Sequence, residues 1–278
     1  MISIRLRLLN PRFSRISTLC LACLMFIAFG GVQRATAGTE ENKAIVRRLH
    51  EEIWNQRNLS VVDEIISPNF VRHTPPNPDI RGREGLKQYI TAIINGLPDF
   101  HLTTEDMIAE GNKVVNRFTA RGTHKGELFG IPPTGKRVTV TGIGIFHIAN
   151  GVIAEDWFNM DFFGLFQQLG VIPPAGGEDY TWGVPMEVTG NPGDPEANKA
   201  LDRRFIEEAF NKGNLAVIDE IFSPTYLRHE PPNPDQVLGI EGFKQFVTVF
   251  RTAFPDLQIT LEEQIAEAGN VVPRFIFR

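Results

Sequence analysis

The chain contains the same unit twice. Residues 42–79 and 198–235 are identical at more than half of their aligned positions, and most of the other positions exchange one apolar residue for another. The match continues past a one-residue insertion in the second copy, as far as residues 117–118 and 274–275. A duplicated sequence of this length favours two similar domains over a single large one.

The repeat divides the chain into four parts. We expect a signal segment at 1–37, a complete domain at 38–172, a linker rich in proline and glycine at 173–196, and a truncated second domain at 197–278. The second copy repeats three helices and two strands of the first, so chemistry that depends on residues after Arg121 is expected only once. Two explanations of the second copy stay open, a functional half-domain and the remnant of a truncated gene.

Residues 1–37 are predicted to direct the protein out of the cytoplasm. They contain five arginines and no acidic residue, with an apolar run at 16–32 and the small residues Ala-Thr-Ala at 35–37. This order is typical of a secretory signal peptide cleaved before Gly38, so the mature protein is expected to be secreted or periplasmic, without membrane attachment. The alternative is an uncleaved membrane anchor, for which the run is somewhat short because a spanning helix needs about 20 apolar residues.

Cysteine content and charge exclude several classes of function. Cys20 and Cys23 both lie in the predicted signal peptide, so the mature chain would have no disulfide, thiol nucleophile or thiolate metal site. Of 28 basic side chains, 23 remain once the five arginines of residues 1–37 are removed, against 33 acidic ones, and the resulting net charge of −10 disfavours nucleic-acid binding. The six histidines include no close pair of the kind that zinc sites use, so no metal is expected.

Helical periodicity comes first in each unit and strand alternation follows it. Helices are predicted at 40–57, 58–66, 83–95 and 162–169, and strands at 70–72, 100–110, 114–122, 137–149 and 152–161. Helices followed by antiparallel strands indicate an α+β fold, with a curved sheet covered by helices on one face. In the second unit, Pro273 cannot donate a hydrogen bond to a neighbouring strand, which predicts that the last strand lies at a sheet edge.

Three sequence motifs resemble the SnoaL-like polyketide cyclase, or ester cyclase, family. They are GTHKG and GIPPTGK within 122–136, GVIAEDW and the following aspartate within 151–161, and QQLG at 167–170. The resemblance covers residues 40–172 and, less completely, 197–278. It implies a cone-shaped fold of the nuclear-transport-factor-like (cystatin-like) type, in which helices close one end and leave an apolar cavity.

The resemblance also implies a chemistry. Cyclases of this family close a ring by an intramolecular aldol reaction on polyketide-like carbonyl compounds, without metal or cofactor. Asp161 matches the family's catalytic aspartate and His147 its active-site histidine. Asp161 lies among apolar residues that would raise its pKa and suit it to act as a base. The alternatives are that Asp161 caps the helix at 162–169 and that His147 is a half-buried strand residue bonded to the backbone.

The turn between the last two strands decides whether Asp161 and His147 share a face of the sheet. If residues 149–151 form a three-residue loop, Ile148 pairs with Val152 and the two side chains lie on one face. A two-residue Asn-Gly turn would place them on opposite faces, because a shift of one residue inverts a strand. We favour the three-residue loop, which still leaves the two side chains several residues apart.

Five further residues are candidates for substrate binding: Trp54, His73, Arg117, His124 and Trp157. The two tryptophans would line a pocket for a flat ligand or belong to the core. His73, repeated as His229, would face the cavity or hold the fold by a hydrogen bond. Arg117 would bind a carbonyl or carboxylate group or pair with a helix acid, and His124 would gate the cavity or fix its own loop.

Two functions of different classes remain. The first is an exported, cofactor-independent enzyme that uses acid–base chemistry on a small apolar carbonyl compound. The second is a non-catalytic module that holds an apolar molecule in the same cavity, because a fold does not fix a chemistry. A third possibility is that the second copy serves as a lid or as a pseudo-dimer partner for the first within the chain, and a homodimer of whole chains is the remaining arrangement.

Overall fold

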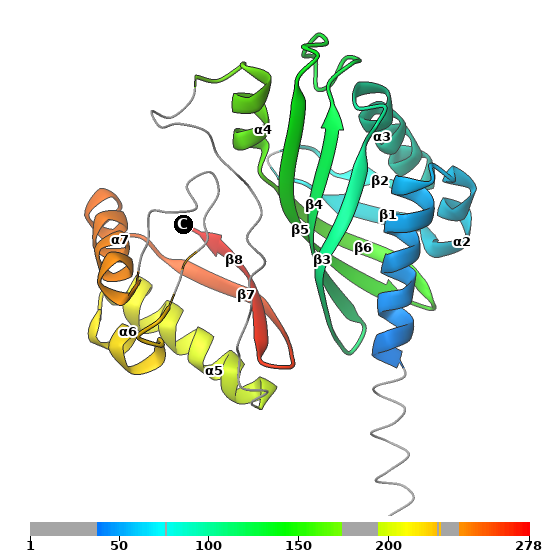
Figure 1. The fold of residues 1–278 in the computed structure, drawn as a ribbon. Helices are drawn as coiled ribbons and strands as arrows, with labels where there is room; N and C mark the ends of the chain where they lie inside the picture. The colour runs from blue at the N-terminus through cyan, green and yellow to red at the C-terminus, as the bar shows by residue number, and fades with distance from the viewer. Residues whose placement is uncertain (1–37, 76, 174–193, 227, 229–238) are drawn as a thin grey trace, which may run out of the picture.

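A computed structural model describes residues 38–75, 77–173, 194–226, 228 and 239–278. The predicted signal peptide with both cysteines, most of the predicted linker and His229 lie outside the described residues. The two copies form separate sheets, of six strands in the first unit and two in the second (Figure 1). Within the described ranges, no helix is both long enough and apolar enough to cross a bilayer.

The helices of the first unit form where apolar residues recur every three or four positions. The helix present from residue 38 continues as the π-helix η1 (Leu49–Asn55) and is followed by η2 (Leu59–Val61), α2 (Val62–Ile65) and α3 (Gly82–Gly96). On α3, Leu86, Ile90 and Ile93 are buried on one face, as expected of an amphipathic helix. The predicted helices are confirmed, although the second ends one residue early because Ile66 already belongs to a strand.

Six strands form the sheet of the first unit, in the order β2-β1-β6-β5-β4-β3. They are β1 (Ile66–His73), β2 (Ile80–Arg81), β3 (His101–Glu110), β4 (Lys113–Thr123), β5 (Arg137–Ala149) and β6 (Val152–Met160), and α4 (Phe162–Leu169) follows them. Neighbouring strands are antiparallel, except that β1 runs parallel to β6. The predicted α+β fold with a curved sheet is confirmed, whereas β2 and the parallel pair were not predicted.

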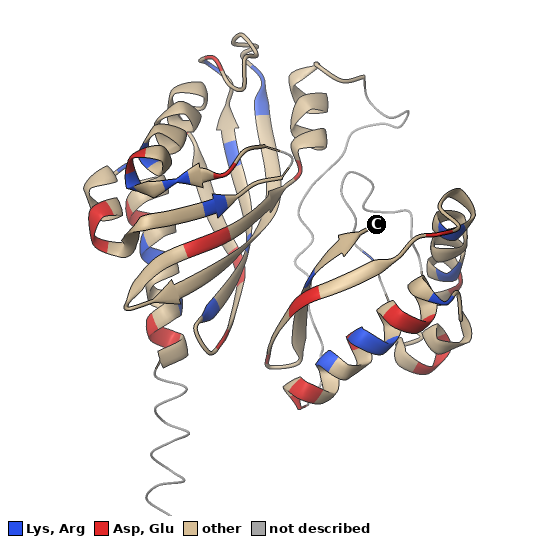
Figure 2. Ribbon diagram, turned by 180° about the vertical axis from the view of Figure 1, so that it is seen from behind, with Lys and Arg blue, Asp and Glu red and all other residues tan. Residues whose placement is uncertain are grey.

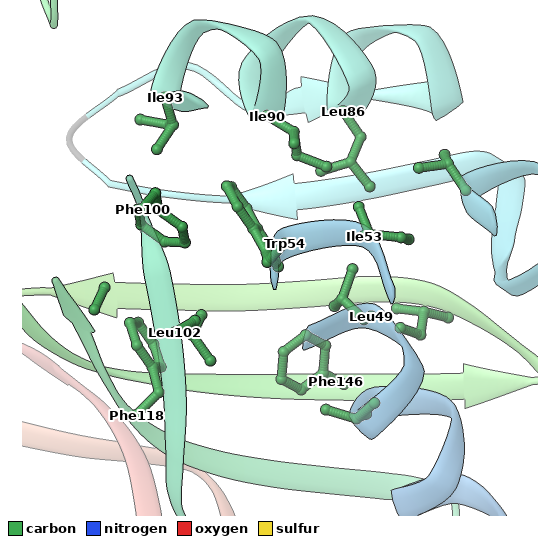
Figure 3. Close-up of a cluster of buried hydrophobic side chains, with 14 of the residues drawn as sticks. Leu49, Ile53, Trp54, Leu86, Ile90, Ile93, Phe100, Leu102, Phe118 and Phe146 are labelled. Carbon is green, nitrogen blue, oxygen red and sulfur yellow. The ribbon is translucent and has the colours of Figure 1, made fainter. Parts of the chain in front are cut away.

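The main core lies between the inner face of this sheet and the helices (Figure 3). Trp54 of η1 contacts Phe100 and the Tyr89 ring of α3, with ring centroids 5.2 Å and 6.3 Å apart. Phe118 of β4 stacks on Phe158 of β6 at 5.1 Å. Aromatic side chains therefore supply much of the buried surface that holds the helices on the sheet.

The turn between β5 and β6 differs from the predicted one. The Asn-Gly dipeptide at 150–151 forms a two-residue turn with φ angles of 53° and 75°, and Ala149 pairs with Val152. The three-residue loop is therefore wrong, because asparagine and glycine both tolerate the left-handed conformation that the shorter turn requires. A β-bulge next to His147 then shifts the register by one residue, so that His147 lies opposite Glu155.

The second unit repeats helices of the first and its β3–β4 hairpin. It consists of α5 (Pro195–Phe205), η3 (Ile206–Asn211), α6 (Ala216–Ile221), α7 (Gly239–Ala253), β7 (Ile259–Glu267) and β8 (Asn270–Phe277). Asn211 exchanges two hydrogen bonds with the backbone of Ile259, just as Asn55 does with Leu102. Among the described strands β8 pairs only with β7, so the edge position predicted from Pro273 is confirmed.

The β7–β8 hairpin packs against the outer face of the first sheet. Ile265 and Val272 of the hairpin form one apolar cluster with Ile108, Val115 and Ile145 of the first unit. Acidic and basic side chains are interspersed over both units, and α5 carries both kinds (Figure 2). The first unit is thus enclosed on two sides, by its own helices and by the second unit.

Candidate functional site

An apolar cavity of about 40 Å³ lies inside the cone, between the helices and the inner face of the sheet. Six aromatic residues form much of its wall: Trp54, Tyr89, Phe100, Phe118, Phe129 and Phe158. Aliphatic side chains supply most of the rest, and Arg121 is the one charged residue that borders the cavity in the described part of the chain. A cavity with such walls favours flat, apolar ligands over water-soluble ions.

A second hollow of about 210 Å³ lies beside this cavity, and Tyr89 and Phe129 line both. Phe129 has a φ angle of 53°, which is uncommon for a bulky residue, and is 44% exposed. Its ring packs edge-on against Phe162, with centroids 5.6 Å apart. Phe129 therefore forms the lip between the cavity and the outer hollow.

His124 fixes the loop that carries this lip. It is fully buried, its Nδ1 atom lies 3.0 Å from the Thr134 hydroxyl, and its backbone N–H donates to the Lys136 carbonyl. At Gly126 the loop runs so close to the Asn95 carbonyl that a Cβ atom would overlap it. His124 does not line the cavity. Of its two predicted roles, the geometry corresponds to fixing the loop.

Asp161 caps α4 at the edge of the cavity. Its Oδ1 atom accepts a hydrogen bond of 2.8 Å from the Gly164 backbone, as the capping alternative predicted. The carboxylate is half-buried and is not part of the cavity wall, but Met160 before it and Leu165 after it both are. Burial raises the pKa of the Asp161 carboxyl, against the opposing effect of the Gly164 N–H group.

The structure does not bring His147 to Asp161. His147 lies opposite Glu155, whereas the Asp161 N–H group bonds to Thr141, six residues farther along β5. Six residues of a strand span roughly 20 Å. His147 instead accepts a hydrogen bond of 2.6 Å from the Asn112 amide and lies 3.9 Å from the Glu155 carboxylate. It therefore belongs to the outer face of the sheet.

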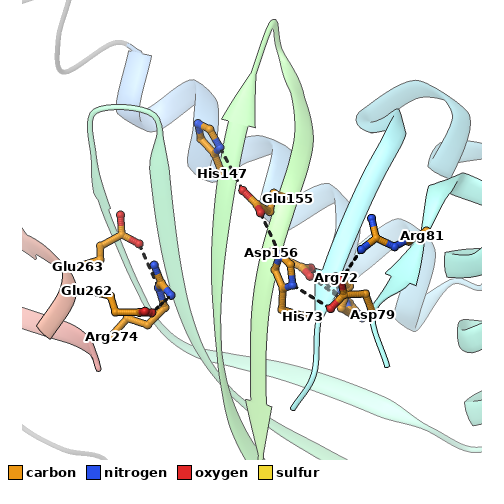
Figure 4. A network of polar contacts seen from close by, with 10 residues as sticks. All are labelled: Arg72, His73, Asp79, Arg81, His147, Glu155, Asp156, Glu262, Glu263 and Arg274. Atoms are coloured by element: carbon orange, nitrogen blue, oxygen red, sulfur yellow. Dashed lines mark hydrogen bonds and ion pairs between the residues drawn. The ribbon is translucent and has the colours of Figure 1, made fainter. Parts of the chain in front are cut away.

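His73 and Trp157 do not line the cavity either. Figure 4 shows His73 between Asp79 and Glu155. The His73 ring bonds to Asp79 at 3.0 Å and to Glu155 at 2.9 Å, and stacks on Trp157 at 5.2 Å. Burial opposes the charged form of His73, but these two carboxylates outweigh it and raise its pKa. Trp157 also makes a cation–π contact with the second unit, because the Arg274 guanidinium lies 4.5 Å from the centre of its ring. Both residues thus join elements of the fold.

Arg117 shares the outer face as well. It pairs with Ile143, which is 40% exposed, and its Nε atom is buried without a hydrogen-bond partner among the described residues. Of the five predicted binding residues, only Trp54 lines the cavity. The alternation of strand residues explains why Arg117 and Trp157 face outward, because each neighbours an inward residue, Phe118 and Phe158.

A buried ion pair beneath the cavity was not predicted. Nε and Nη2 of Arg72 donate to the Asp156 carboxylate at 3.0 Å and 2.6 Å, and both side chains are almost fully buried. The Arg72 guanidinium lies 4.8 Å from the Phe158 ring and 5.7 Å from the Tyr89 ring, two walls of the cavity. Period-two counting from Phe158 would have placed Asp156 inward, which is the signal that sequence reasoning missed.

Tyr89 is the polar group shared by both hollows. Burial raises the pKa of its phenol, while the charge of Arg72 acts in the opposite direction. Among the described residues, no group of histidine, cysteine, aspartate or glutamate side chains has the arrangement of a metal site. The groups available around the cavity include the Asp161 carboxylate, the Tyr89 phenol and the Arg121 guanidinium, beside aromatic walls.

These features define a class of protein, a cone-shaped α+β domain that encloses an apolar cavity with a carboxylate at its edge. Residues 44–169 and 200–278 match the family model of the SnoaL-like polyketide cyclases. The chain belongs to this family, whose members support a cyclase- or isomerase-type function. Both copies match, so the repeat is a tandem of two family domains.

Relatives and solved structures resemble one copy at a time. The aklanonic acid methyl ester cyclases DnrD of Streptomyces peucetius and DauD of Streptomyces sp. (strain C5) are each 29% identical over 133 residues, which is 45% of this chain and 88% and 80% of the two relatives. TsrD from Streptomyces laurentii is 34% identical, with a TM-score of 0.43 over 46% of this chain and 97% of that one. A SnoaL-like polyketide cyclase from Agrobacterium tumefaciens str. C58 is 17% identical, with a TM-score of 0.40 over 46% and 98%.

Proposed function

We propose that the first unit is an exported, cofactor-independent enzyme of cyclase or isomerase type that acts on a small apolar carbonyl compound. The observation that carries the proposal is Asp161, a half-buried carboxylate of raised pKa that lies in the chain between Met160 and Leu165, two residues of the largely apolar cavity wall. The family supports the class of reaction. The basic, apolar N-terminal segment supports export, and N-terminal sequencing of the mature protein should begin at Gly38.

Asp161 is the base in this proposal. One carboxylate oxygen is held by the Gly164 N–H group, which leaves the other to accept a proton from the carbon next to a substrate carbonyl. A carboxylate of raised pKa is a stronger base than an exposed one, since the proton it accepts is bound more tightly. Once the carbon–hydrogen bond has broken, the resulting carbanion attacks a second carbonyl of the same molecule. One carbon–carbon bond forms as the π bond of that carbonyl breaks and leaves its electron pair on the oxygen.

Tyr89 is the acid. Its raised pKa keeps the phenol protonated, and it lines both the cavity and the outer hollow, where the receiving carbonyl oxygen would lie. The hydroxyl would give its proton to that oxygen as the ring closes. The proton held by Asp161 would then reach the Tyr89 phenolate through solvent, which restores both side chains to their initial states. The Arg72–Asp156 pair beneath Tyr89 would hold the phenol in place.

The size of the cavity limits the substrate. A volume of about 40 Å³ holds a few water-sized groups, so a polycyclic compound can enter only if Phe129 turns and joins the cavity to the outer hollow. The aromatic walls fit a flat substrate. The aklanonic acid methyl ester that names two relatives is a reasonable first substrate, and smaller aromatic β-keto esters test the size limit.

The test is turnover of these compounds by the mature chain and by Asp161→Asn. Removing the base while keeping the shape of the side chain should lower kcat by about 10²- to 10⁴-fold. Glu155→Gln, which changes a carboxylate on the outer face, is the matched control and should keep wild-type turnover. Full turnover by Asp161→Asn would exclude Asp161 as the base.

A second candidate function is binding without turnover. It is favoured by the cavity wall itself, which contains no carboxylate among the described residues. If the protein is a binding module, native mass spectrometry of the wild type would find a bound apolar ligand. Asp161→Asn would bind that ligand with unchanged Kd, and neither the wild type nor the variant would convert it. Conversion of that ligand by the wild type alone would instead support the enzyme.

A further inference from the structure

Two buried lysines join the units in the same way. The Nζ atom of Lys43 lies 2.8 Å from Glu267 of the second unit, and that of Lys199 lies 2.5 Å from Glu110 of the first. The lysines are only 7% and 8% exposed. Lys43 and Lys199 occupy equivalent positions of the repeat, and so do Glu110 and Glu267. Exchanging the copies therefore converts one ion pair into the other.

The same two carboxylates bind equivalent backbone groups. The N–H group of Ala109 donates to Glu267 at 2.9 Å, and that of Ala266 donates to Glu110 at 2.9 Å. Ala109 and Ala266 are also equivalent in the repeat. Each glutamate thus forms an ion pair with the lysine of the other unit. It also accepts a hydrogen bond from the residue that precedes the other unit's glutamate.

The apolar contacts follow the same exchange. Ile108 and Ile265 are 6% and 1% exposed, occupy equivalent positions, and lie in one cluster with the equivalent pair Val115 and Val272. Burial opposes the charge of each lysine at the edge of this cluster, but the bonds to glutamate outweigh it and raise the pKa of both. Charges and apolar groups are therefore arranged about a common two-fold relation.

An interface in which one surface meets its own equivalent is the isologous interface of two-fold dimers. We infer that the outer face of the first unit is a self-pairing surface whose partner is a second copy of the same face, and that the second unit occupies this surface within the chain. Among the residues of the first unit that contact the second are Lys43, Glu110, Ile108 and Val115. The same four residues would contact each other's equivalents if two first units paired through this face. The second unit thus keeps the chain monomeric.

The test reverses charge on the second unit alone. In the mature chain carrying Lys199→Glu and Glu267→Lys, like charges would face each other at both ion pairs, so the second unit should leave the surface. Lys43 and Glu110 remain, and two chains should pair through them. Sedimentation velocity and light scattering should give one chain mass for the wild type and two for the variant.

The matched control reverses all four charges. Adding Lys43→Glu and Glu110→Lys to the variant restores opposite charges within the chain, and the protein should return to one chain mass. The inference is overturned if the two-residue variant stays monomeric, whether it keeps the wild-type sedimentation coefficient or becomes extended. It is also overturned if the four-residue variant is still dimeric.

A milder pair of variants tests the two-fold relation even if the charge reversals do not fold. Glu267→Gln and Glu110→Gln each weaken one charge-assisted bond in the otherwise unchanged chain. Hydrogen exchange at Ala109 should accelerate about tenfold in the first and at Ala266 about tenfold in the second. Equal effects support the two-fold relation, and an effect in only one of the two variants contradicts it.

Discussion

His50 is a buried histidine that the fold holds neutral. Its side chain is 2% exposed and its Nδ1 atom lies 3.1 Å from the Thr104 hydroxyl. Burial, and secondarily the charge of Arg72, lower the pKa of His50 to about 3 from an ordinary value of 6.5. In the second copy, the equivalent positions hold Ile206 and Leu261, so the chain itself contains the apolar version of this pair.

Acid should therefore destabilise the first unit through His50. A folded-state pKa below the unfolded one gives stability that is present above pH 6.5 and lost as the pH falls toward 3. Between pH 7 and pH 4 the loss is roughly 3 kcal/mol. Urea denaturation at both pH values should show this loss in the wild type, and His50→Ile with Thr104→Leu should lack it. Equal pH dependence in the two proteins would contradict the assignment.

Gly164 leaves room for the Asp161 carboxylate. A Cβ atom at this position would overlap Oδ2 of Asp161 and come within 2.8 Å of its Cγ atom. Gly164→Ala should therefore displace the carboxylate by about 1 Å and lower kcat by about 10²-fold, because reacting groups tolerate little displacement. The expected change in Tm is small, since the gain in helix propensity offsets the weakened cap.

Gly85→Ala on α3 is the control for this substitution, because its Cβ would make an ordinary contact of 3.4 Å with Ile80. It should keep wild-type kcat. If Gly164→Ala also kept wild-type kcat, the position of the carboxylate would not matter and the proposed base would lose its support.

At the scale of the elements, glycine allows β5 to pass close to the aromatic rings. A Cβ atom at Gly142 would overlap the Phe118 ring and lie 2.8 Å from the Asn159 carbonyl. Gly142→Ala should lower the free energy of unfolding by about 1–3 kcal/mol through overpacking. Phe118→Leu in the same chain should recover part of this loss in a double-mutant cycle, and strictly additive effects would show that the ring is not the obstacle.

The helices and antiparallel strands could be predicted from the sequence because each rests on a local pattern. Leu86, Ile90 and Ile93 mark the buried face of α3, and at the start of β5 the buried Val138 and Val140 alternate with less buried residues. The fold class and the edge position of Pro273 follow from the same patterns. The parallel pairing of β1 with β6 could not be predicted, because no local signal specifies which distant strand will be the neighbour.

The site was predicted less well than the fold. The bulge beside His147 is one residue of irregular backbone, and it determines which side chains face the cavity beyond the turn. Asp161 stays the candidate base because it lies in the chain between Met160 and Leu165, which both line the cavity. Its nearness to the cavity therefore does not depend on how β5 and β6 are aligned. Asp156 was missed because a buried charge is read as an exposed one until its partner, here Arg72, is known.

For the whole molecule, the duplicated sequence gives two units with different tasks. The first unit has the cavity, the carboxylate and the phenol, and the second covers its outer face through paired lysines and glutamates. Because that face lies on the far side of the sheet from the cavity, separating the units should affect assembly before it affects chemistry. The proposed chemistry therefore depends on the first unit, and on Asp161 within it.

The proton transfer proposed for Asp161 can be measured directly, as the exchange of an acidic carbon-bound hydrogen of the substrate for deuterium. The chain from Gly38 onward, incubated in D₂O with an aromatic β-keto ester over a range of pH, should accelerate exchange above the buffer rate. The rate should depend on a group whose pKa exceeds the ordinary 3.8 of aspartate, and Asp161→Asn should abolish the acceleration. Exchange no faster than buffer, or equally fast in Asp161→Asn, would contradict the account.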